Sequence, residues 1–287
     1  MLRFGHRAMA CDWELYLPVD DRAYGEQAAR AAFEEVDRLE EELSRFVPTS
    51  DIARIPSLRA GESLRIGADT RECLEIAEEV RAHTGGAFDV AFRTRLDAAG
   101  AEEDRARAVL EIDSAARSVR AGVDGPIVDL GGIGKGFAID RAMSIVRDWG
   151  FEAALLHGGQ SSLLALGAPP RHEGWLLDIR DPRDPSKALG RVRLRDRALS
   201  GSGVLTRGRH IVDPRSGQAA AGGAGAWAET PAAALSDALS TAFLLLAPEE
   251  VAACCSGHPG TGALLPAVAE EGDTRLLAFG DTGLLDE

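Results

Sequence analysis

Apolar and polar positions repeat along this chain with helical spacing over several stretches. The first begins at Phe33, after which Val36, Leu39, Leu43 and Phe46 follow three or four residues apart while glutamates fill the positions between them. Apolar residues at this spacing form one stripe along a helix. The pattern therefore predicts an amphipathic helix through Phe46, with a solvated acidic face.

Four further stretches have the same period and recognisable ends. Asp69, with Glu72 three residues on, is expected to be the N-cap of a helix that stops at Gly85-Gly86. Another helix is expected from Phe137 to Gly150. Residues 231–246 predict a third, and Pro248 starts a shorter one through Cys254.

Short apolar or alternating runs between these helices predict strands. Two such runs, 109–113 and 118–120, are expected to form a hairpin, and the apolar run 126–130 is expected to be a short buried strand. The remaining predicted strands are 153–156, 175–179, 190–194 and 276–279. Because strands and helices do not alternate regularly, the pattern favours the α+β class. We expect one domain over residues 1–287.

Composition narrows the classes of partner. The chain has 287 residues, 45% of them apolar, and a formal net charge of −14. This charge argues against a nucleic-acid or anionic-membrane surface, because both are polyanions.

We find no signal-peptide run and no apolar stretch near the roughly 18 residues of a membrane span, and so expect a cytoplasmic protein. The four cysteines lack metal-site spacing and are expected to be reduced packing residues.

The densest chemical signal is a glycine loop between the predicted strand 126–130 and the next helix. It runs Asp129-Leu130-Gly131-Gly132-Ile133-Gly134-Lys135-Gly136. Loop amides and a helix N-terminus favour a phosphate ligand, and a lysine adds positive charge. The spacing is that of neither a Walker A loop nor a dinucleotide-binding Gly-x-Gly-x-x-Gly. A tight turn without a ligand is the alternative.

Two weaker signals follow. Asp237 and Thr241 are four apart and share a helix face, where they offer two hard oxygen ligands suited to Mg²⁺ with a nucleotide; a solvated surface pair is the alternative. His210 opens a short predicted strand that leads into the turn 213–217. A histidine there can act as a base, or can simply bond to the turn backbone.

Together and in order, these segments resemble the ApbE family of flavin transferases. The family pattern includes Met-Gly-Thr, Gly-Gly-x-Phe-Asp, Asp-Leu-Gly-Gly-Ile-x-Lys-Gly, His-Ile-x-Asp-Pro and Ala-Asp-x-x-x-Thr. This chain has corresponding segments at Met9-Ala10-Cys11, Gly85 to Asp89, Asp129 to Gly136, His210 to Pro214 and Ser236 to Thr241. The first of them departs from the pattern at two of its three positions.

The resemblance implies a single α+β flavin-transferase domain that uses FAD and Mg²⁺ and attaches FMN to a threonine or serine of a target protein, releasing AMP. It also implies site residues by position. The FAD site would be lined by Met9, Ala87, Phe88, Asp89, Asp129, Lys135 and Ile211. Asp237 and Thr241 would hold Mg²⁺, with the Gly132 carbonyl and an additional contact from Ser240. His210, or Asp213 acting through it, would take the acceptor's proton.

Two other functions remain open from the sequence. A Mg²⁺-dependent FAD pyrophosphatase would use water in place of the acceptor hydroxyl and give FMN and AMP. A non-catalytic FAD-binding protein would hold the flavin without cleaving it. Asp237, Thr241 and Lys135 together argue against the binder, because a flavin store has little use for a metal that activates the pyrophosphate.

Overall fold

One large antiparallel sheet organises the chain. The computed structural model describes residues 1–97, 108–203, 212–218, 225–268 and 274–285. Eight strands form this sheet in the order β1-β2-β6-β7-β10-β11-β12-β13, and smaller sheets pair β3-β5-β4 and β8-β9. The strands are β1 Leu2–Ala8, β2 Cys11–Leu17, β3 Ser63–Arg65, β4 Leu110–Asp113, β5 Ser118–Ala121, β6 Ala154–Gly158, β7 Ser162–Leu166, β8 Trp175–Arg180, β9 Ala188–Leu194, β10 Arg197–Gly203, β11 Gly225–Thr230, β12 Gly262–Val268 and β13 Thr274–Gly280.

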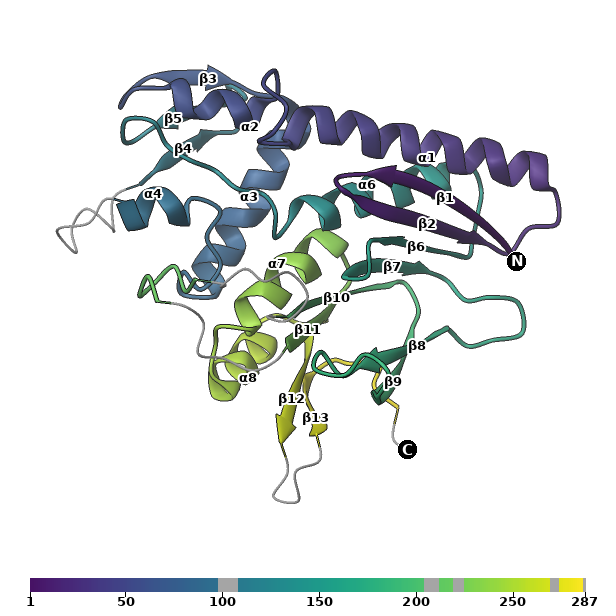
Figure 1. Cartoon of the computed structure of the whole chain (residues 1–287). Helices are drawn as coiled ribbons and strands as arrows, with labels where there is room; N and C mark the ends of the chain where they lie inside the picture. The colour runs from purple at the N-terminus through teal and green to yellow at the C-terminus, as the bar shows by residue number, and fades with distance from the viewer. Residues whose placement is uncertain (98–107, 204–211, 219–224, 269–273, 286–287) are drawn as a thin grey trace.

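Helices pack against one another and against the large sheet (Figure 1). They are α1 Arg22–Leu43, α2 Asp51–Arg54, the short 3₁₀ helix η1 Ile55–Ser57, α3 Ala68–His83, α4 Phe92–Asp97, α6 Gly134–Asp148, α7 Ala233–Phe243 and α8 Pro248–Gly257. Helix α6 contacts both α1 and α7 and also packs on β6 and β7. Helices gathered on an antiparallel sheet confirm the α+β class.

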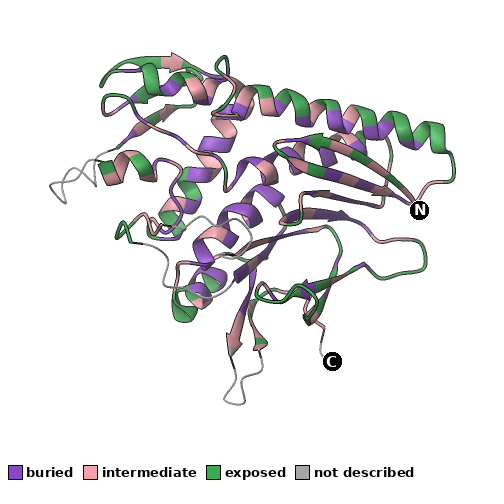
Figure 2. Cartoon of the chain, viewed as in Figure 1, coloured by how far each residue is buried: buried purple, intermediate pink, exposed green. Residues whose placement is uncertain are grey.

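The two faces of the sheet bury different cores. Strand β2 shows the alternation: Trp13 and Leu15 are fully buried in the main core under the helices, whereas Tyr16 packs against a second core on the other face. The β8-β9 hairpin covers that second core with Trp175 and Val192. In β9 the arginines alternate outward, so its outer face is exposed to solvent. The buried segments in Figure 2 accordingly continue from the helices into the central strands.

Several helix ends differ from those that periodicity predicts, most of all the start of α1, which lies at Arg22 rather than Phe33. Helix α1 ends at Leu43, and Phe46 lies beyond it with 77% of its surface exposed rather than on the apolar stripe. Helix α3 has Gly67, not Asp69, as its N-cap. The Thr70 N–H at the start of α3 donates to the Glu42 carboxylate of α1 at 3.2 Å, and the Asp69 carboxylate bonds instead to Arg38 and Arg141. Periodicity finds these helices but not the tertiary contacts that set their ends.

The predicted strand 126–130 is also wrong. The segment is extended and buries Val128 and Leu130, but it belongs to no sheet. Its amides bond instead to groups around α4: the Ile127 N–H donates to Thr94 Oγ1 at 2.7 Å and the Asp129 N–H to the Val90 carbonyl at 2.8 Å. The apolar run of five residues correctly indicates that the segment is buried. It does not indicate strand pairing, because pairing needs a neighbouring strand, and no described strand pairs with this segment.

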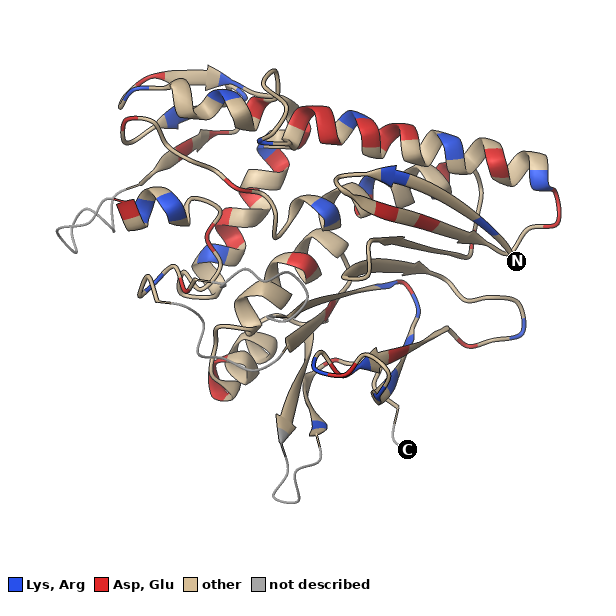
Figure 3. Cartoon of the chain, viewed as in Figure 1, with Lys and Arg blue, Asp and Glu red and all other residues tan. Residues whose placement is uncertain are grey.

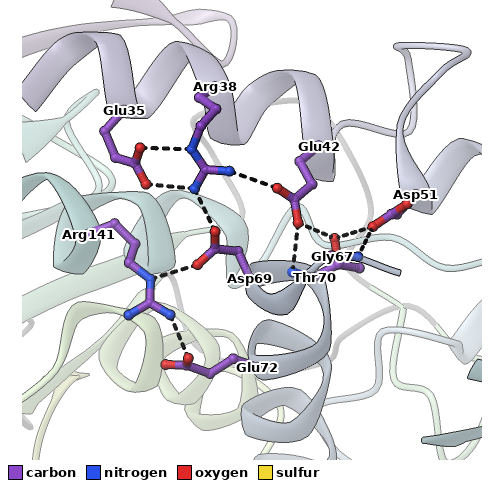
Figure 4. A network of polar contacts seen from close by, with 9 residues as sticks. All are labelled: Glu35, Arg38, Glu42, Asp51, Gly67, Asp69, Thr70, Glu72 and Arg141. Atoms are coloured by element: carbon purple, nitrogen blue, oxygen red, sulfur yellow. Dashed lines mark hydrogen bonds and ion pairs between the residues drawn. The ribbon is translucent and has the colours of Figure 1, made fainter. Parts of the chain in front are cut away.

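A polar network ties helices α1, α3 and α6 together (Figure 4). Arg38 of α1 bonds to Glu35 and Glu42 on its own helix and to Asp69 of α3. Arg141 of α6 bonds to Asp69 at 3.0 Å and to Glu72. This network fixes α6, and with it the glycine loop, against the rest of the helical layer.

Within the described ranges, no helix has both the length and the apolar character needed to cross a lipid bilayer.

Candidate functional site

The glycine loop lies against α7 and Phe88. A Cβ atom placed on Gly132 would stand 3.1 Å from Cε2 of Phe88 and 3.2 Å from the Thr241 hydroxyl oxygen. Contacts this tight would require Phe88 or Thr241 to shift by a few tenths of an ångström, so glycine lets the loop backbone approach both groups. The loop therefore reaches the Asp237–Thr241 helix face, far away in the sequence.

Asp237 is the centre of the contacts between the loop and α7. It is 5% exposed and is the one charged residue in α7, a helix that Figure 3 draws almost entirely tan. The Lys135 ammonium lies 3.1 Å from each carboxylate oxygen. The Gly136 N–H donates to Oδ2 at 3.1 Å and the Ser162 hydroxyl to Oδ1 at 2.9 Å. The alternative of a solvated surface carboxylate is therefore wrong: Asp237 is a buried charge with a cation and two further donors.

Hydroxyl groups continue from Asp237 along α7. Ser240 is fully buried, donates to the Asp237 carbonyl at 2.9 Å, and lies 2.9 Å from the Ser202 hydroxyl of β10. Ser202 is also 3.3 Å from the half-buried Thr241 hydroxyl. Carboxylate, hydroxyl and loop backbone thus converge where α7 meets the glycine loop and the ends of β7 and β10.

This donor set fits Mg²⁺ better than a softer metal. Asp237 and Thr241 present hard oxygen atoms, and a Cβ on Gly132 would stand 3.2 Å from the Thr241 hydroxyl oxygen. No cluster of three His, Cys, Asp or Glu side chains that could hold a metal occurs in the parts of the chain that the structure describes. Mg²⁺ commonly takes one or two protein ligands and completes its shell with phosphate oxygens and water. Asp237 already pairs with one cation, the Lys135 ammonium, so its surroundings suit a positively charged ligand.

A second carboxylate, Asp129, stands at the entrance of the loop in a more open setting. Its Oδ1 accepts the Gly131 N–H at 3.1 Å, and Oδ2 lies 3.6 Å from Arg45 Nε and 3.7 Å from an Arg93 guanidinium nitrogen. Arg45 also lies over the exposed Phe46 ring, 4.6 Å from its centroid. Sequence reasoning missed both arginines and the phenylalanine.

The other predicted flavin-site residues occupy varied positions. Ala87, Phe88 and Asp89 are buried between α3 and α4. The Asp89 carboxylate bonds to Arg95 at 2.6 Å and accepts the Ala91 N–H at 2.7 Å. Its oxygens thus hold the start of α4.

Met9 lies in the β1-β2 turn with a positive φ of 48°, followed by Ala10 at 57°. Its N–H donates to Glu40 of α1 at 2.7 Å. Two consecutive left-handed residues form a tight turn, a conformation that glycine adopts more readily than the alanine at position 10.

Asp213 belongs to a compact turn, and His210 and Ile211 fall outside the described residues. The Asp213 carboxylate bonds to the Arg215 guanidinium at 2.9 and 3.0 Å, and Arg215 also donates to the Leu245 carbonyl. Burial acts to raise the pKa of Asp213, but the bonds from Arg215 outweigh it and hold that pKa below its ordinary value. A carboxylate held in this way is a weak base.

Comparisons with known proteins identify relatives of this chain. The sequence profile of the ApbE family matches residues 9–265. A FAD:protein FMN transferase of Rhodobacter capsulatus is 28% identical over 222 residues, which are 68% of this chain and 42% of that protein. The chain thus spans less than half the length of this curated relative.

Solved structures extend the likeness to nearly the whole fold. The apo flavinyl transferase ApbE of Pseudomonas stutzeri is 25% identical with a TM-score of 0.80, covering 97% of this chain and 94% of that one. The flavin transferase ApbE of Vibrio cholerae, 17% identical, has a TM-score of 0.79 and covers 97% and 96%. The ApbE protein of Thermotoga maritima, 22% identical, has a TM-score of 0.76 and covers 96% of both chains. Since the family profile matches most of its length, this chain belongs to the ApbE family.

Proposed function

We propose that this protein is a Mg²⁺-dependent FAD:protein FMN transferase that joins FMN from FAD to a threonine or serine hydroxyl of a target protein and releases AMP. Family membership and the names of its relatives support the reaction class. The observation that carries the proposal is the buried Asp237 carboxylate, which meets both Lys135 and the Gly136 amide of the glycine loop. A loop rich in amides beside a carboxylate suits a pyrophosphate that carries its own metal ion.

In this proposal the glycine loop and Lys135 bind the FAD pyrophosphate. Several loop amides donate within the protein, so the Gly132 and Lys135 amides would donate to phosphate oxygens, and the ammonium of Lys135 would neutralise part of their charge. Asp129 with Arg45 and the exposed Phe46 ring would contact the flavin nucleotide at the open side. Met9, Ala87, Phe88, Asp89 and Ile211 would complete the pocket wall.

Asp237 and Thr241 would hold the metal through their side chains, with the Gly132 carbonyl as a third ligand and Ser240 supporting Thr241 through Ser202. When bound, Mg²⁺ would neutralise the pyrophosphate and make its phosphorus more electrophilic. Lys135 must then share Asp237 with the metal, and its flexible stem lets the ammonium turn toward the phosphate.

The transfer itself forms one bond and breaks one. The acceptor hydroxyl oxygen attacks the phosphorus on the FMN side, its proton passes to His210, and the bond to the AMP oxygen breaks with the electron pair leaving on AMP. Positioning and charge neutralisation dominate such a phosphoryl transfer. Asp213, whose pKa is lowered and which Arg215 holds, is suited to orienting His210 rather than to taking the proton.

The direct test is a mass measurement on an acceptor. Recombinant protein is incubated with FAD, Mg²⁺ and a candidate acceptor flavoprotein, and the acceptor is weighed intact while AMP and FMN are quantified by chromatography. We expect an acceptor heavier by one FMN unit, with AMP in equal amount and no reaction in EDTA.

Other outcomes identify the alternatives. Equal amounts of free FMN and AMP with an unchanged acceptor would favour the pyrophosphatase. Intact FAD recovered from a tight complex, with neither product, would favour the non-catalytic binder. Either result would overturn the transferase proposal for the acceptors used.

A further inference from the structure

A half-buried carboxylate outside the contacts described so far joins the two helices of the site. Asp140 of α6 accepts the Ala233 N–H at 2.7 Å and the Ala234 N–H at 2.8 Å. These amides open α7, whose own N-cap residue is Ala232 and makes no side-chain cap bond. The first amides of a helix have no partner within it. Helix α7 therefore takes its cap from α6 instead of from its own sequence.

The two helices meet along matching faces. Gly136 and Asp140 are four apart on α6, and Ala233 and Asp237 are four apart on α7, so each pair shares one helix face. Gly136 touches α7 so closely that a Cβ there would stand 2.1 Å from the Ala233 carbonyl oxygen. One turn from Ala233, Asp237 accepts the Gly136 N–H. The Asp140 cap and the Asp237 contacts are thus two ends of one interface.

The energetics of Asp140 argue against a role in stability alone. Burial raises its pKa to about 6, even though the two α7 amides act to lower it. Keeping this group ionised at neutral pH therefore costs the folded state free energy. A serine or asparagine at position 232 would cap α7 without burying a charge. What Asp140 offers in addition is a fixed link between the helices that carry Lys135 and Asp237.

We infer that Asp140 is a positioning residue: by holding the first two amides of α7, it sets the axial position of that helix so that Asp237 meets Lys135 and Gly136. Thr241, one turn further along the same face, is placed by the same contact. The expected effect of Asp140 on turnover rests on the proposed function, whereas its expected effect on the position of α7 does not.

The Gly136 amide provides a readout independent of activity. It is the third residue of α6, so it lacks an acceptor within its own helix, and the Asp237 carboxylate accepts its proton. If α7 shifts, the bond from the Gly136 N–H to Asp237 weakens, although the Asp140 side chain bonds to neither of these two residues. Hydrogen exchange of the Gly136 amide therefore reports the position of Asp237.

The experiment compares Asp140→Asn with a matched control. Asparagine keeps the shape and one acceptor oxygen, and Asp140→Ala removes both acceptors. The control is Asp51→Asn, because Asp51 likewise holds the start of a helix: it accepts the Gly67 N–H at 2.6 Å and the Thr70 hydroxyl at 3.0 Å at the start of α3. Exchange is followed by NMR at Gly136 and at the core amide of Leu156, and AMP release from FAD is measured in parallel.

We expect Asp140→Asn to speed exchange at Gly136 at least tenfold with little change at Leu156, Asp140→Ala to speed it more, and Asp51→Asn to leave it unchanged. AMP release should fall at least tenfold in the Asp140 variants, with FAD affinity in the absence of Mg²⁺ kept within about threefold. Unchanged exchange at Gly136 in both Asp140 variants, or an equal rise at every amide, would overturn the inference. If the parent protein releases no AMP, the proposed function fails, and the Gly136 exchange rates still decide the role of Asp140.

Discussion

Two carboxylates flank the glycine loop, and they are held in opposite ways. Asp237 has 6% of its side chain exposed, with Lys135, Gly136 and Ser162 within 3.1 Å of its oxygens. Asp129 has 20% exposed, and its two arginine neighbours stand 3.6 and 3.7 Å away. Asp237 is thus enclosed by three close donors, one of them a cation, whereas Asp129 has one close donor, the Gly131 N–H at 3.1 Å, and two more distant arginines.

The difference separates two tasks within one site. An enclosed carboxylate with close donors is preorganised, which is what a metal site needs in order to act without rearrangement at the moment of reaction. A half-buried carboxylate with long arginine contacts can exchange those partners for a ligand at lower cost, because long ion pairs contribute little. We therefore assign the chemical step to the Asp237 side and nucleotide binding to the Asp129 side.

Asp237→Asn should give the largest effect. It keeps the shape of the side chain but removes the charge that a metal needs, so AMP release from FAD should fall roughly 10³-fold, equivalent to several kcal/mol of lost transition-state stabilisation. The matched variant Asp129→Asn should lose less than about tenfold in turnover and should mainly weaken FAD binding. Steady-state assays at millimolar Mg²⁺ measure both. Equal losses in the two variants would break the division of tasks.

Lys135→Met should affect both tasks at once. It removes the cation that faces Asp237 and, in the proposal, the pyrophosphate, so FAD affinity and AMP release should each fall by roughly 10–100-fold. Lys135→Arg, which keeps the charge, is the control and should retain more of both. Titration of flavin fluorescence and the AMP assay provide the two numbers. Parental values for the methionine variant would make the loop a tight turn without a ligand.

Phe46→Ala tests whether the Asp129 side of the site binds the flavin nucleotide. The ring is 77% exposed, so its loss should change folding stability little. If it stacks on the flavin nucleotide, FAD affinity should weaken by up to about tenfold, the usual range for an aromatic contact. Leu176→Ala, at another exposed apolar residue on β8, is the control. Identical FAD affinity in parent and Phe46 variant would remove Phe46 from the site.

The smallest expected effect is the pH dependence that Asp140 contributes. Its folded pKa of about 6 lies above the ordinary value of 3.8, so the folded state binds the proton more tightly. The stability it contributes is thus fully present below the ordinary value and is lost as pH rises through about 6. Between pH 5 and 7.5 the unfolding free energy of the parent should fall by about 1 kcal/mol relative to Asp140→Asn. Urea titrations measure it, and parallel pH profiles would contradict the assignment.

Features of this site that depend on neighbouring residues in the sequence can be predicted, whereas contacts between segments far apart in the sequence cannot. Periodicity predicts α3, α6, α7 and α8 within a few residues, and the resemblance brings the glycine loop and Asp237 to notice. The partners of Asp237 were not predictable, because Ser162 comes from β7, one of several strands that the sequence pattern did not reveal. The cap at Ala233 was missed for the same reason, since its acceptor, Asp140, lies on another helix.

Failures of prediction also have local causes. Phe46 continued the apolar spacing of α1, but spacing does not mark where Ser44 caps the helix. The run 126–130 was apolar enough for a strand, yet its amides bond to Thr94 and Val90 around α4. Both errors arise because tertiary partners, rather than period, decide where an element ends or whether it pairs.

The central claim is that Asp237 belongs to a metal site completed by the FAD pyrophosphate. Mn²⁺, a paramagnetic substitute for Mg²⁺, tests this most directly, because bound and free ions are distinguished by electron paramagnetic resonance. The account predicts that Mn²⁺ binds the parent and Asp129→Asn when FAD is present, and that Asp237→Asn with FAD binds it at least tenfold more weakly. Equal Mn²⁺ affinity in Asp237→Asn and the parent, with FAD bound to both, would contradict it.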